Sequence, residues 1–185
     1  MARTLLLFLF SSILAHGFSP ELSRVEPRGG RVGSEVQIQL YGSRLNDPQE
    51  LLLYNKGLTV KSLIPNKDGK SVKAIIAIAS DAPLGEHPMR LRCKSGLTYM
   101  RTFWVGQFPT VMEARSEDNK RDLNDTFKEP QKIDLNVTVQ GVADREDDDY
   151  YQVQCEKGQR LSVEVEAMRL GRVMFDPYVA ILDED

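Results

Sequence analysis

The chain is poor in the two side chains that most often carry enzyme chemistry and zinc, with 2 histidines and 2 cysteines in 185 residues. His16 falls in the apolar N-terminal segment, which leaves His87, beside Pro88 and directly after a turn signal. A Ser-His-Asp or Cys-His site would have to use His87, and no G-x-S-x-G motif accompanies it. One histidine and two separated cysteines also fall short of an ordinary zinc site. We therefore expect no catalytic residue, and we expect His87 at the surface without a role.

Basic clusters and helical periodicity are missing as well. The 24 Lys and Arg are scattered, and no basic helix or arginine stripe marks a nucleic-acid interface. Beyond the first residues no apolar run approaches the roughly 20 residues that span a bilayer. Nucleic acid is thus excluded as a partner, and so is a transmembrane segment in the mature chain.

The N-terminus carries the features of an export signal. "MARTLLLFLFSSILAHGFS" has Arg3, an apolar run and small residues at Ala15 and Gly17. This pattern predicts a secretory signal peptide at 1–17, with an uncleaved membrane anchor as the alternative. Either way we expect the rest of the chain to be exported, to the periplasm, the cell surface or the extracellular medium.

Charge is divided unevenly along the remainder. Residues 18–110 contain 13 Lys and Arg against 8 Asp and Glu, a net charge of +5, whereas residues 111–185 contain 10 against 19, a net charge of −9. The asymmetry indicates two modules.

The first part consists of short runs in which apolar and polar side chains alternate, the pattern of half-buried strands. "EVQIQLYG" at 35–42 is the clearest of them. Similar runs, separated by turn formers, occupy 50–54, 58–64, 71–79, 87–93 and 97–105. They predict an all-β chain whose first module is a β-sandwich at 19–108.

The second part begins with a polar stretch without periodicity, which predicts a linker at 109–124. Alternation resumes at 132–142, 150–155, 160–167 and 178–183, which predicts a second β-sandwich at 125–185. Four strands make a thin sandwich with exposed edges, so we expect this second module to be incomplete, that is, truncated.

Both modules resemble known families. "LSRVEPRGGRVGSEVQIQLYGSRL" and "PLGEHPMRLRCKSGLTYMRTFWVG" resemble the opening and the closing hairpin of an immunoglobulin-like TIG-type domain. The stretch from Val137 onward, with Gly141, the acidic turn before Tyr150, "KGQ" and Asp176-Pro177, is similar to the bacterial pre-peptidase C-terminal domain. The tandem order is like that of exported planctomycete-type proteins. The resemblance implies accessory β-sandwich domains.

The acidic turn is the candidate metal site. Five carboxylates lie within one loop, at Asp144, Glu146, Asp147, Asp148 and Asp149, and Asp176 precedes the last run. Hard oxygen ligands of this kind suit calcium, and some pre-peptidase-type domains bind calcium near comparable turns. We name Asp147, Asp149 and Asp176 as possible calcium ligands. The alternative, which we favour, is a turn whose carboxylates accept backbone N–H groups and that needs no cofactor.

Two further patterns leave alternatives open. Cys93 and Cys155 either pair across the modules or remain free buried thiols in phase with apolar neighbours. Tyr99, Phe103 and Trp104 either form an exposed row that stacks on carbohydrate or belong to the core.

These features predict a non-catalytic exported module for binding or adhesion at the cell envelope, with an extracellular protein or polysaccharide as partner. The alternative is the N-terminal accessory part of a longer secreted peptidase or other hydrolase. An open reading frame that continues past the Asp185 codon into a catalytic domain would favour that alternative.

Overall fold

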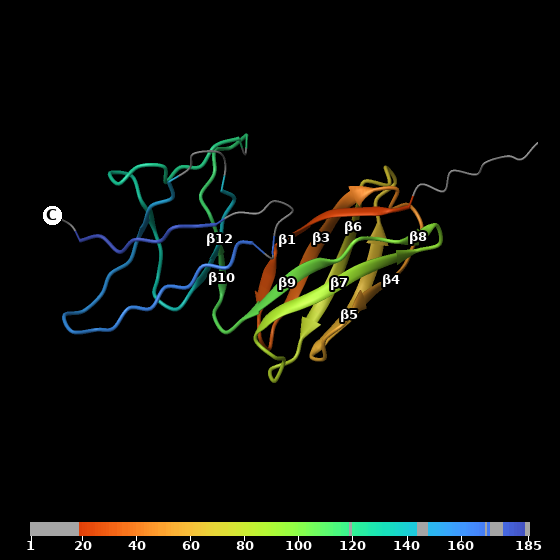
Figure 1. The fold of residues 1–185 in the computed structure, drawn as a ribbon, viewed down its shortest axis with the longest axis horizontal. Coiled ribbons are helices and arrows are strands. Elements are labelled where there is room, and N and C mark those ends of the chain that lie inside the picture. The colour runs from red at the N-terminus through yellow and green to blue at the C-terminus, as the bar shows by residue number, and fades with distance from the viewer. Residues whose placement is uncertain (1–18, 119, 144–147, 169, 171–175, 184–185) are drawn as a thin grey trace, which may run out of the picture.

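The structure is a computed structural model that describes residues 19–118, 120–143, 148–168, 170 and 176–183. The predicted signal peptide at 1–17 and Asp147 of the acidic turn lie outside these residues. The described residues form strands, turns and loops without an α-helix, so the predicted all-β class is confirmed (Figure 1). It follows that no described segment qualifies as a membrane-spanning helix.

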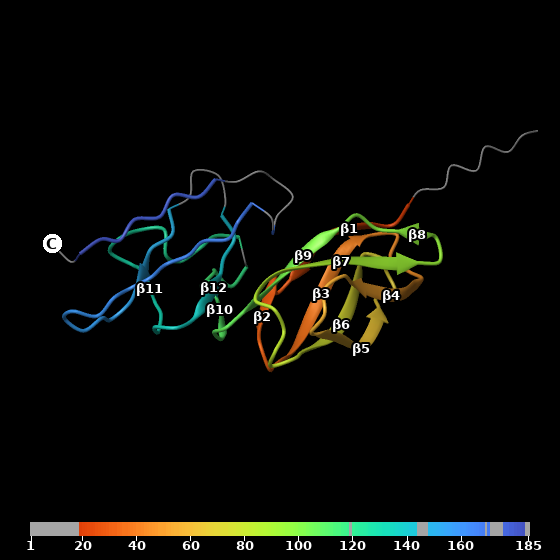
Figure 2. The same cartoon turned by 60° about the horizontal axis from the view of Figure 1, so that its bottom comes forward.

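The strands between residues 21 and 106 form a two-layered unit, which we call the N-terminal sandwich. Its strands are β1 (Glu21–Glu26), β2 (Gly29–Arg31), β3 (Glu35–Ser43), β4 (Pro48–Leu53), β5 (Leu58–Pro65), β6 (Ser71–Ile78), β7 (Gly85–Cys93), β8 (Gly96–Leu97) and β9 (Arg101–Gly106). One sheet has the order β1-β3-β6-β5, and the other has the order β2-β9-β7-β4 with β8 paired to β7. Figure 2 shows the two sheets facing each other.

The alternation in the sequence produces the core between these sheets. In β3, Ile38 and Leu40 point inward and are fully buried, whereas Gln37 is exposed. The other sheet contributes Leu91, Phe103 and further apolar side chains to the same cluster. Each fully buried side chain of this size contributes about 1.5–3 kcal/mol of transfer free energy. The expected sandwich at 19–108 therefore has a continuous apolar core.

Gly42 lies inside β3. It pairs with Leu22 of β1, beside an irregularity in the register of the two strands. A Cβ atom at this position would lie 1.8 Å from the carbonyl oxygen of Glu21. Glycine is required here because the two backbones approach too closely for any side chain.

Two expectations for the N-terminal sandwich are wrong. His87 is buried rather than at the surface. It lies on β7, an interior strand of its sheet, and pairs with Phe103 on the neighbouring strand β9. The run 97–105 is not one strand: it divides into β8 and β9 around Thr98, which is buried and hydrogen-bonded to Leu91. The aromatic row is divided as a result, with Phe103 buried, Trp104 half-buried and Tyr99 exposed.

The residues from 109 onward, which we call the C-terminal region, form two short parallel ladders. β10 (Thr110–Met112) pairs with β12 (Thr138–Gln140), and β11 (Gln131–Lys132) pairs with β13 (Tyr151–Gln152). The expected strand at 132–142 is interrupted at Asn136, whose φ of 57° is incompatible with an extended backbone. The expected strands at 160–167 and 178–183 are not formed, and Val163, Val165 and Ile181 are exposed.

The polar stretch predicted as a linker at 109–124 belongs to the C-terminal region rather than standing free of it. Besides β10, it holds an isolated bridge between Arg115 and Asp122. It also holds Glu113, Asp122 and Asn124, which are the buried residues among those described from 107 onward. The stretch is therefore polar at its buried positions as well as at its exposed ones.

Candidate functional site

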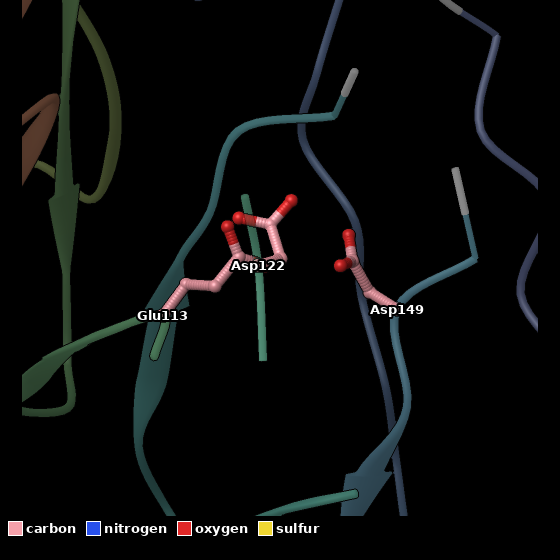
Figure 3. Close-up of side chains that lie close together, drawn as sticks. All are labelled: Glu113, Asp122 and Asp149. Atoms are coloured by element: carbon pink, nitrogen blue, oxygen red, sulfur yellow. The ribbon is translucent and has the colours of Figure 1, made fainter. Parts of the chain in front are cut away.

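Three carboxylates from separate parts of the C-terminal region converge on one point. Figure 3 shows Glu113, Asp122 and Asp149 with their carboxylate groups turned toward one another. One ligand atom from each residue lies within 4.8 Å of those of the other two. Glu113 and Asp122 are buried and Asp149 is half-buried. We call these three residues the acidic cluster.

The backbone brings the three acids together through the short ladders. Glu113 directly follows β10, and its N–H donates to the carbonyl of Gln140 at 3.0 Å, which extends the β10–β12 pairing by one residue. Asp122 lies opposite Arg115 in the isolated bridge. Asp149 comes shortly before β13, and the next residue donates its N–H to the carbonyl of Asn124 at 2.9 Å. Each acid therefore stands at a position fixed by backbone hydrogen bonds.

Both oxygens of Glu113 accept hydrogen bonds. Tyr151 Oη donates to Oε1 at 2.7 Å, and the backbone N–H of Val142 donates to Oε2 at 2.9 Å. Gly141 permits the second bond, because a Cβ atom there would lie 2.8 Å from Glu113 Oε1. A buried carboxylate needs such donors to offset its loss of hydration.

A guanidinium group supplies positive charge to the acidic cluster. Arg115 Nη1 forms an ion pair with Asp122 Oδ1 and lies 3.7 Å from Glu113 Oε2. The Arg115 side chain is largely buried, as are the side chains of both its partners. Because low polarity strengthens charge interactions, we expect this ion pair to hold the two sides of the hairpin from 113 to 124 together.

An amide completes the surroundings of the acidic cluster. Asn124 is fully buried, and its Nδ2 donates to Asp149 Oδ1 at 3.3 Å. Its other polar atom, Oδ1, has no hydrogen-bond partner among the described residues. The amide thus contacts the acidic cluster through its nitrogen, and its oxygen is left unsatisfied.

The acidic cluster also acts on Tyr151. Burial raises the pKa of the Tyr151 hydroxyl far above its ordinary value, and the hydrogen bond to Glu113 and the charges of Glu113 and Asp149 raise it further. The hydroxyl therefore remains protonated and continues to donate at any physiological pH.

The structure brings together only part of the predicted calcium set. Asp149 belongs to the acidic cluster, whereas Asp176 is exposed and is not part of it. Asp147 lies outside the described residues. The predicted set of Asp147, Asp149 and Asp176 as calcium ligands therefore stays a prediction.

The arrangement seen here does not fit a calcium ion. Calcium takes 6–8 oxygen ligands at about 2.3–2.6 Å. In the acidic cluster the Glu113 oxygens already accept hydrogen bonds from Tyr151 and Val142, and a cationic nitrogen lies against Asp122. Bound in this way, the carboxylates act as acceptors within a structural network.

Three of the residues in this network were not predicted from the sequence: Glu113, Arg115 and Asp122. They lie in the stretch taken for a linker, and no local spacing connects them with the acidic turn, since Glu113 and Tyr151 are 38 positions apart. An acid two residues before an arginine is too common to indicate a buried ion pair.

The cysteines are both free, Cys93 buried and Cys155 exposed. The buried-thiol alternative is thus confirmed for Cys93 and wrong for Cys155, which follows the end of β13. Burial, and secondarily the nearby Asp47, raises the pKa of Cys93 to about 11. Neither thiol lies in the acidic cluster.

Comparison with known proteins adds no assignment: no family model matches the chain, and no curated protein matches its sequence.

Proposed function

We propose that this chain is a non-catalytic module that is exported and binds a protein partner at the cell envelope or outside the cell. The observation that carries the proposal is an apolar surface at one end of the N-terminal sandwich. Leu97, Tyr99 and Met100 are exposed there, Tyr99 by 74%. We call these three residues the distal tip, since β8 lies at the end of the sandwich away from the C-terminal region (Figure 1).

The distal tip is held in place by Thr98. This residue is buried, its N–H donates to the carbonyl of Leu91 at 3.0 Å, and its Oγ1 accepts from the Leu91 N–H at 2.9 Å. The side chains on either side of Thr98 are thereby turned outward on an anchored backbone. A surface ordered before binding loses less conformational entropy when a partner docks, which favours affinity. Tyrosine and methionine are also enriched at protein interfaces.

The positions of the reactive side chains support a non-catalytic role. His87 lies in the apolar core, and its Nε2 lies 2.7 Å from the carbonyl of Pro83. In the acidic cluster, Glu113 accepts hydrogen bonds from Tyr151 and Val142, and Asp122 is paired with Arg115. The two-sheet architecture of residues 21–106 also fits the TIG-type resemblance, and accessory domains of that kind are typically binding modules.

The test is a binding screen with the full chain against immobilised extracellular proteins and insoluble polysaccharides, followed by variants of the distal tip. We expect binding to a protein that falls about tenfold or more in the double variant Tyr99→Ser, Met100→Ser. Leu84→Ser is the matched control, because Leu84 is also exposed but directly precedes β7, whose other end pairs with β8. If the double variant and the control variant bind the protein equally well, the role of the distal tip is refuted.

The same screen distinguishes the other outcomes. Retention on a polysaccharide that depends on Tyr99 would replace the protein partner with a glycan. Turnover of any of these materials by the purified chain would overturn the non-catalytic role.

A further inference from the structure

The acidic cluster contains its own cation, and this bears on whether it takes up metal. Arg115 lies opposite Asp122 in the isolated bridge, and one nitrogen of its guanidinium group contacts both Asp122 and Glu113. A divalent ion held by Glu113, Asp122 and Asp149 would need the same carboxylate oxygens. Two cations in one buried site repel each other strongly, since low polarity screens them little.

The surrounding groups nevertheless form an oxygen-rich site. Besides the three carboxylates, Asn124 offers an amide oxygen that is fully buried and has no hydrogen-bond partner among the described residues. Its amide nitrogen contacts Asp149, so the group lies at the edge of the acidic cluster. Carboxylate and amide oxygens are the ligands that calcium prefers. Of the groups described around the acidic cluster, Arg115 carries the positive charge that such a set opposes most strongly.

We propose that Arg115 is the resident cation of the acidic cluster, that it excludes calcium from Glu113, Asp122 and Asp149, and that its removal uncovers a calcium site. Three carboxylates and one guanidinium carry a formal charge of −2 at neutral pH. Without Arg115 the formal charge of these groups is −3, and Glu113 and Asp122 lose the guanidinium group that contacts them. A divalent ion then restores the balance that the side chain provided.

The experiment compares the full chain with Arg115→Met, which retains an unbranched apolar stem but no charge. Calcium chloride is the probe, with isothermal titration calorimetry and thermal unfolding as readouts. We expect no binding by the unsubstituted chain. We expect Arg115→Met to bind one calcium ion with a dissociation constant of about 1 mM or tighter, in the range of extracellular calcium modules. Its midpoint of unfolding should fall without calcium and rise again when calcium is added.

Controls separate this effect from a general gain of negative charge. Arg121→Met removes an exposed arginine from the same hairpin and should leave the chain unresponsive to calcium. Arg115→Lys keeps a cation and should also remain unresponsive. Adding Asp122→Asn to Arg115→Met should abolish the response.

Two results would overturn the proposal. One is stoichiometric calcium binding by the unsubstituted chain, which would mean that Arg115 excludes nothing. The other is an Arg115→Met variant that gives no calorimetric signal at calcium concentrations up to about ten times the expected dissociation constant of about 1 mM. If this variant is unfolded without metal, calcium must restore amide protection in β10 and β12, and failure to do so counts against the proposal.

Discussion

The N-terminal sandwich and the C-terminal region are both built from short strands, but they bury opposite kinds of side chain. The sandwich buries an apolar cluster that runs through both sheets. The buried residues described in the C-terminal region are Glu113, Asp122 and Asn124, while Tyr178 is 91% exposed and Leu182 is 61% exposed. Apolar burial stabilises in proportion to the area removed from water, whereas a buried polar network depends on every partner. We therefore expect the sandwich to tolerate the loss of a polar contact better than the C-terminal region does.

The strongest test of this contrast uses one residue type in both regions. Leu91→Ala in β7 should lower the free energy of unfolding by about 2–5 kcal/mol, because it leaves a cavity in a packed core. Leu182→Ala should change it by less than about 0.5 kcal/mol, since its side chain is mostly exposed. Chemical denaturation measures both. Equal losses would show that the C-terminal region has an apolar core of its own.

The two free thiols offer a second test. The raised pKa of Cys93, about 11 against an ordinary 9.0, lowers its thiolate fraction near pH 8 by about 100-fold. Cys155 is exposed and should react rapidly with a thiol-specific disulfide reagent, while Cys93 should react only on unfolding. Spectrophotometric titration of native and denatured protein, with Cys155→Ser as control, gives the two rates. Fast reaction at Cys93 in the native chain would contradict a closed sandwich.

The hydrogen bond from Tyr151 to Glu113 makes the C-terminal region sensitive to alkaline pH. Since the pKa of Tyr151 is higher in the folded chain than in the unfolded chain, the stability it confers is fully present below about pH 10 and decreases as the pH rises above that value. Tyr151→Phe should cost about 1–2 kcal/mol near pH 7 and should remove part of the alkaline slope. The pH dependence of stability is measured between pH 7 and pH 11, with unfolding monitored by amide hydrogen exchange. A slope that Tyr151→Phe leaves unchanged would rule out this hydrogen bond as its source.

The smallest effect is expected at the exposed ion pair of the N-terminal sandwich. Arg92 Nη2 lies 2.9 Å from Glu50 Oε2, and both side chains are about half exposed. Glu50→Gln should change the free energy of unfolding by less than about 1 kcal/mol, because water screens the pair. Asp122→Asn, which breaks the buried pair with Arg115, should cost clearly more. Similar losses in the two variants would remove the distinction between the two regions.

Sequence alone determined the all-β class, the strands β3 to β7 of the N-terminal sandwich and the separation of charge. The period-two pattern was sufficient there because one face of each strand meets an apolar partner sheet, as Ile38 and Leu40 show. The same pattern at 160–167 and 178–183 did not produce strands, because alternation records which face is apolar but not whether a partner backbone is present.

Only the tertiary structure decided the burial of His87, the division of β8 from β9 and the composition of the acidic cluster. His87 is buried because β9 and β4 flank β7, an arrangement set by sheet order rather than by neighbouring residues. Glu113, Arg115 and Asp122 meet Asp149 and Tyr151 because two ladders fold distant segments onto one another. Charged residues in a polar stretch give no sequence signal of burial, since the partners that make burial tolerable come from elsewhere in the chain.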